Sequence, residues 1–169
     1  MQKSNMTPAA VFLFLVYLSL ILESTWCILC SSHFLHLDAI PALICWLALK
    51  SEPIPGTVSV IVAGLIAALF SSVPFYLFPV SYLMAFFTIY LVRANILEMP
   101  YIQAYFFTGF VSVEILVVQL SGSGNPELLW PWEMVQALLN MVFAPPVFWV
   151  CDRCLKGLTK VIARFRHER

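Results

Sequence analysis

The sequence predicts an all-α, polytopic membrane protein with six transmembrane helices in a single domain. Of its 169 residues, 62% are hydrophobic and 11% are charged, whereas a soluble domain has about 25% charged residues. The apolar residues come in runs near the length of about 20 residues that crosses a bilayer. A third observation, the placement of the basic residues, gives the same number of helices.

Short polar breaks separate the apolar runs. We expect spans at 8–26, 34–50, 57–73, 75–93, 100–121 and 133–151. No small-residue cleavage site follows the first span, so we expect it to stay in the membrane. Asp38 and Pro41 lie in the second span, which we expect to be broken, tilted or partly re-entrant. Small residues form one face of the third span and indicate close helix packing: Ala63, Gly64, Ala67, Ala68 and Ser71.

The basic residues set the predicted orientation. With six spans, every Lys and Arg falls on the side of the two termini, and the intervening loops 23–33, 71–75 and 122–132 contain none. Because cytoplasmic segments carry the excess of positive charge, we expect both termini in the cytoplasm. This bias fits a bacterial inner membrane. The nine residues are Lys3, Lys50, Arg93, Arg153, Lys156, Lys160, Arg164, Arg166 and Arg169.

Polar side chains inside the spans are candidate packing or partner-binding residues. Glu114 lies in the fifth span, where an ionised carboxylate costs on the order of 3 kcal/mol. Gln136 and Asn140 share one face of the sixth span. Glu114 and Asn140 both lie about 10 Å below the outer surface. We therefore predict a hydrogen bond between them; a proton or ion relay is the alternative. Asp38 is either interfacial or part of the same polar set.

The sixth span contains Pro145 and Pro146 and leads into a basic segment. We expect a transmembrane domain over 1–155 and a cytoplasmic tail over 156–169, whose apolar residues recur at helical spacing. Such a tail is typical of an amphipathic helix on the membrane surface. Each basic residue near anionic lipid contributes about 1 kcal/mol. The predicted surface contacts are Arg153, Lys156, Lys160, Arg164 and Arg166; the same surface could bind a cytoplasmic protein.

Two CxxC pairs occur, Cys27–Cys30 and Cys151–Cys154. Two such pairs often bind zinc, but these lie at opposite membrane faces, about 30 Å apart, so we expect no metal site. The outer pair resembles that of DsbB-type thiol oxidoreductases. Those enzymes use a second outer cysteine pair, which the 122–132 loop lacks, so a redox role is a minor alternative to packing.

Two local patterns resemble the MreD family of bacterial rod-shape proteins. The first is the segment 36–41 (HLDAIP), which opens a second span ending at Lys50. The second is 137–145 (ALLNMVFAP) in the closing helix. Glu114 falls where the family often has a polar residue. The resemblance covers most of 8–155. One departure is 70–72 (FSS), where the family often has an acidic residue and a glycine.

The resemblance implies a non-enzymatic scaffold of the elongation (rod-shape) complex, without a cofactor. Its fold would resemble the substrate-binding membrane subunit of energy-coupling-factor transporters. Its implied partner is MreC, with RodA and the transpeptidase partner of RodA, and MreB indirectly; no nucleic acid is expected. The residues themselves form no Ser/His/Asp set or phosphate-binding loop. The alternative function is a vitamin-binding transporter subunit, with Asp38, Glu114, Gln136 and Asn140 lining a pocket.

Overall fold

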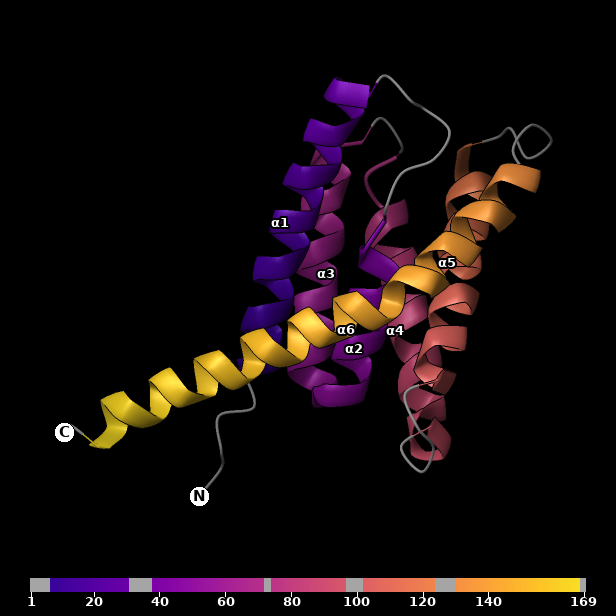
Figure 1. Cartoon of the computed structure of the whole chain (residues 1–169). Coiled ribbons are helices and arrows are strands. Elements are labelled where there is room, and N and C mark those ends of the chain that lie inside the picture. The colour runs from indigo at the N-terminus through magenta and orange to yellow at the C-terminus, as the bar shows by residue number, and fades with distance from the viewer. Residues whose placement is uncertain (1–6, 31–37, 72–73, 97–101, 124–129, 168–169) are drawn as a thin grey trace.

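The computed structural model describes residues 7–30, 38–71, 74–96, 102–123 and 130–167. Within these residues the chain forms six α-helices and no strand, as the all-α prediction requires. Successive helices run in alternating directions through the bundle (Figure 1). The helices are α1 Thr7–Cys30, α2 Ile40–Lys50, α3 Pro53–Leu69, α4 Leu77–Ile96, α5 Ile102–Ser123 and α6 Trp130–His167.

The short helix α2 lies at the centre of the bundle. It contacts all five other helices, and its residues from Ile40 to Ala48 are all buried. A helix that is apolar on every face is stable only when it is surrounded. The sequence predicted a second span over 34–50, and the described helix has 11 residues. Residues 34–37 lie outside the described part of the chain.

Polar groups make hydrogen bonds at both ends of α2. At its start, Asp38 Oδ1 accepts a hydrogen bond of 2.9 Å from the Ile40 backbone N–H. At its end, Ser51 N donates to Leu47 O at 2.8 Å, and Arg93 Nη1 of α4 donates to Ser51 O at 3.0 Å. Pro53 then opens α3, at a position where its missing N–H is not needed.

The predicted small-residue face of α3 packs against α4. Ala63 and Ala67 are buried, and a Cβ added to Gly64 would lie 2.6 Å from Pro79 Cα and 2.7 Å from Pro79 N. The two backbones therefore approach too closely at this point for any side chain. Small residues make such close contacts between helices possible.

Helix α6 is longer than the predicted sixth span. It continues without interruption from Trp130 to His167, through Pro145 and Pro146, so the predicted sixth span 133–151 and the predicted helical tail belong to one helix. A proline removes one backbone hydrogen bond and can bend a helix without ending it. The helix changes direction near its middle, and its C-terminal part extends beyond the bundle (Figure 1).

Two of the described helices are long and apolar enough to cross a membrane. These segments are Thr7–Thr25 of α1 and Met134–Arg164 of α6. The apolar parts of the other four helices are shorter. At about 1.5 Å per residue, α2 covers about 16 Å, roughly half of the hydrocarbon core.

Replacing Gly64 by alanine should lower stability by about 1–3 kcal/mol, because the α3 and α4 backbones must separate to admit the methyl group. The measurement is the midpoint of detergent-induced unfolding. Gly157→Ala is the matched control, since a Cβ there meets nothing within 4 Å and alanine favours a helix. Equal midpoints for Gly64→Ala and Gly157→Ala would show that the α3–α4 approach is not as close as described.

Candidate functional site

A laterally open groove lies between α1, the start of α2, and α6. Its volume is about 480 Å³, and it is lined mainly by apolar side chains. Leu22 of α1, which is 61% exposed, and Phe143 of α6 stand at its edges. Small residues line its interior, among them Ser19, Ala39 and Ala42. We call this feature the lateral groove.

Two carboxylates line the lateral groove. Glu23 of α1 and Asp38 before α2 are close enough for their charges to interact, and the buried Tyr82 of α4 lies near both. No Lys, Arg or His occurs among the described residues that line the groove. The groove is therefore apolar along most of its length and acidic where these two residues meet.

A chain of hydrogen bonds joins α5 to α6 beside the groove. Gln136 Nε2 donates to Asn140 Oδ1 at 3.0 Å, Asn140 Nδ2 donates to Ser112 Oγ at 3.2 Å, and Ser112 Oγ donates to Thr108 O at 2.8 Å. All four residues are buried. Gln136 and Asn140 thus share one face of α6, one helical turn apart, as their spacing predicted, and a hydrogen bond joins them. Asn140 also lines the groove.

The predicted hydrogen bond between Glu114 and Asn140 is not formed. Glu114 Oε1 instead accepts from Thr88 Oγ1 of α4 at 3.1 Å. Its other oxygen, Oε2, is buried and has no hydrogen-bond partner among the described residues. Ser112 and Glu114 are two positions apart, about 200° around the helix, so they face opposite neighbours. Ser112 faces α6 and Glu114 faces α4.

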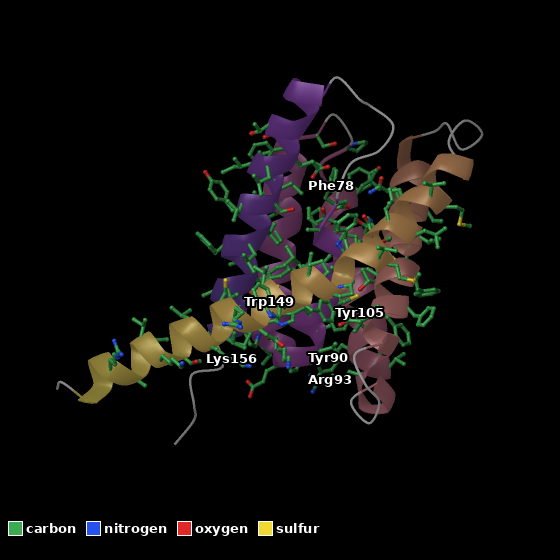
Figure 2. All side chains as sticks on the ribbon, viewed as in Figure 1. Phe78, Tyr90, Arg93, Tyr105, Trp149 and Lys156 are labelled. Atoms are coloured by element: carbon green, nitrogen blue, oxygen red, sulfur yellow. The ribbon has the colours of Figure 1, made fainter. Side chains whose placement is uncertain are left out.

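Basic residues gather at the opposite end of the bundle from Phe78 (Figure 2). Arg93 stacks on Tyr90 at 4.0 Å, and Arg153 lies 5.0 Å from the centre of the Trp149 ring. Such stacking orients a cation while its charge stays hydrated.

Asp152 joins α6 to α2 at this basic end. Its Oδ1 accepts a 2.9 Å hydrogen bond from the indole Nε1 of Trp46, a side chain with 0% exposure. The same oxygen lies 4.0 Å from Lys50 Nζ. A fully buried indole N–H needs an acceptor, and Asp152 supplies it.

The predicted surface contacts lie along the C-terminal part of α6. Arg153, Lys156, Lys160 and Arg164 are exposed, and the side chain of Arg166 lies outside the described set. Leu158, Val161 and Ile162 are also exposed in this segment. The segment is therefore a helix with both basic and apolar side chains available to a surface.

The remaining predicted positions lie on α1 and α6. Pro145 is half-buried inside α6. Cys151 is a buried free thiol that lines the groove, and Cys154 is a half-buried free thiol. The side chains of Cys27 and Cys30 lie outside the described set. In the part of the chain that the structure describes, no three His, Cys, Asp or Glu residues are grouped to hold a metal ion.

The structure separates the four residues that were expected to line one pocket. Asp38 and Asn140 line the lateral groove, while Gln136 and Glu114 do not. The sequence interpretation missed Glu23. Its signal was a carboxylate inside the predicted first span 8–26, the same signal that drew attention to Glu114 in the fifth.

Comparisons with protein-family models, with curated proteins and with solved structures found no match to this chain.

Replacing Asn140 by leucine should lower stability by about 1 kcal/mol or more, because it removes the acceptor of Gln136 Nε2 and the donor to Ser112 Oγ. The triple variant Ser112→Ala/Gln136→Leu/Asn140→Leu removes both partners of each bond and should recover much of the loss. The midpoint of detergent-induced unfolding measures the stability of both variants. A wild-type midpoint for Asn140→Leu would contradict the network.

Proposed function

We propose that the chain is a six-helix protein of the bacterial inner membrane that acts as a non-enzymatic scaffold. In this proposal both termini are cytoplasmic, and the lateral groove receives a membrane helix of a partner protein. The resemblance to the MreD family makes MreC the expected partner. The complex would then include RodA and its transpeptidase partner, and would help couple MreB to peptidoglycan synthesis.

The observation that carries this proposal is the lateral groove. Membrane helices associate where small residues let them approach closely, and Ser19, Ala39 and Ala42 provide such a surface. A helix with its side chains is about 10 Å across, so it would lie over the opening while its side chains fill the 480 Å³. Helices α1 and α6 diverge on either side of this opening (Figure 1).

The charge distribution supports the proposed orientation. The described basic residues lie at one end of the bundle, at the ends of α2 and α4 and along the last part of α6. The positive-inside rule assigns that end to the cytoplasm. Six helices in alternating directions then bring both termini to the same side, although α2 alone covers only about half of the hydrocarbon core.

The C-terminal part of α6 supports a second contact, with anionic lipid. Its exposed basic residues Lys156, Lys160 and Arg164 alternate with exposed apolar ones, as in helices that lie in the membrane interface. The segment leaves the bundle at its basic end (Figure 1). In this proposal it anchors the cytoplasmic side of the scaffold.

A substrate-binding transporter subunit is the second candidate function, and the groove volume favours it. Small-molecule pockets usually enclose about 300–1,000 Å³, and the groove falls in this range. Its lining is largely apolar, however, and a water-soluble vitamin needs several converging polar groups. A rise in melting temperature with one member of a vitamin panel would select this function over the scaffold.

Filling the groove should abolish partner binding without unfolding the chain. In Ser19→Phe, the ring would occupy space that the partner helix needs, so we expect at least a tenfold loss of MreC in mild-detergent co-purification. Ser24→Phe is the matched control, because Ser24 is exposed on the same helix and does not line the groove. Equal MreC recovery with both variants would refute the proposed docking site.

A further inference from the structure

Glu114 of α5 has one carboxyl oxygen that makes no hydrogen bond to any described residue. Its Oε1 lies 3.1 Å from Thr88 Oγ1 of α4, while its Oε2 is buried without a partner. Among the described residues, no other buried side-chain nitrogen or oxygen is in this position. An ionised carboxylate offers about four acceptor sites, so a single hydroxyl contact would leave the anion mostly unsatisfied.

The helices around Glu114 bring no positive charge to it. Helix α5 contains no Lys, Arg or His, and it packs against α2, α4 and α6. Arg93 of α4 is held at the basic end of the bundle, where it donates to Ser51 O. Lys50 of α2 and the described basic residues of α6 lie at the same end. The titratable group of α2 that lies close enough to interact with Glu114 is the thiol of Cys45.

A neutral carboxylic acid fits this environment better than an anion does. Burial of an unpaired ion costs far more than burial of the neutral group, so a buried acid without a counter-charge takes up a proton. A protonated carboxyl has one O–H donor, and a threonine hydroxyl accepts as well as donates. The 3.1 Å contact between Glu114 Oε1 and Thr88 Oγ1 has the length of such a bond. The remaining Oε2 is then an uncharged carbonyl oxygen, which costs less to leave unpaired.

We propose that Glu114 and Thr88 form a proton-binding site between α5 and α4. Glu114 is a carboxylic acid at neutral pH, and its Oε1–H donates to Thr88 Oγ1. The bound proton joins the two helices without a counter-charge. Neither residue lines the lateral groove, so this site and the proposed docking function stand or fall separately.

Infrared difference spectroscopy of the full-length chain in liposomes at neutral pH tests the proton directly. The C=O stretching band of a protonated carboxyl is absent from an ionised carboxylate. Subtracting the spectrum of Glu114→Gln from that of the wild type isolates the bands of Glu114 from those of the other acids. We expect one protonated-carboxyl band, equivalent to one group per chain, and no carboxylate bands. Carboxylate bands in this difference spectrum would overturn the inference.

Glu52→Gln is the matched control, because Glu52 is an exposed carboxylate at the start of α3. Its difference spectrum should contain carboxylate bands and no protonated-carboxyl band. A protonated-carboxyl band of equal size for Glu52 would show that the signal does not depend on burial, and it would also overturn the inference.

Variants of Thr88 test where the proton is donated, and they retain Glu114 if Glu114→Gln does not fold. In Thr88→Val the acid loses its acceptor, so its C=O band should remain and move to higher frequency. Thr88→Ser keeps a hydroxyl and should leave the band at the wild-type frequency. An unmoved band in Thr88→Val, or the same displacement in both variants, would contradict the bond to Thr88.

Discussion

A helix that ends inside an apolar bundle must have its terminal backbone groups satisfied by other polar groups of the protein, because apolar side chains offer no hydrogen bonds. This constraint applies to helix α2. It has 11 residues, about half of what a span needs, and it is surrounded by the other five helices. Asp38 satisfies a backbone N–H at its start, and Arg93 binds the carbonyl of Ser51 just beyond its end. Trp46 and Asp152 fix its last turns to α6. Several of the few polar side chains in this apolar chain therefore serve one short helix.

The lateral groove follows from the same constraint. Residues such as Ala39 and Ala42, at the start of α2, leave space between α1 and α6 that larger side chains would have filled. Asp38 is held there by its bond to the start of α2, and this brings it close to Glu23 of α1. A single residue thus binds the first backbone N–H of the central helix and also contributes negative charge to the groove. The proposed scaffold function uses the groove that the short helix leaves between α1 and α6.

Much of the architecture could be predicted from composition and spacing. The all-α class, the approximate bounds of α1, α3, α4 and α5, and the small-residue face of α3 all depend on local sequence, and the structure agrees with them. The common face of Gln136 and Asn140 also followed from helical spacing, although the hydrogen bond between them was not predicted. The central position of α2 could not be predicted. An apolar run that contains Asp38 and Pro41 is compatible both with an interrupted transmembrane span and with a buried core helix.

The contacts that the sequence could not predict depend on helix rotation and on distance along the chain. Glu114 and Ser112 are near neighbours in sequence, and only the packing of α5 decides which of them faces Asn140. The bond between Trp46 and Asp152 joins residues 106 positions apart, and neither residue carries a local signal of the other. The continuity of α6 was not predicted, because the double proline and the following charges separated the predicted span from the predicted tail, whereas one helix continues to His167.

The most direct measurement is site-specific photocrosslinking in native membranes, with mass spectrometry of the crosslinked peptides. A photoreactive residue at Leu22 lies at the edge of the groove, and one at Phe110 is as exposed, at 57% against 61%, but lies on α5 outside the groove. The account predicts crosslinks from position 22 to a transmembrane segment of one partner protein and none to that segment from position 110. Crosslinks to the same segment from both positions, or from 110 alone, would contradict it.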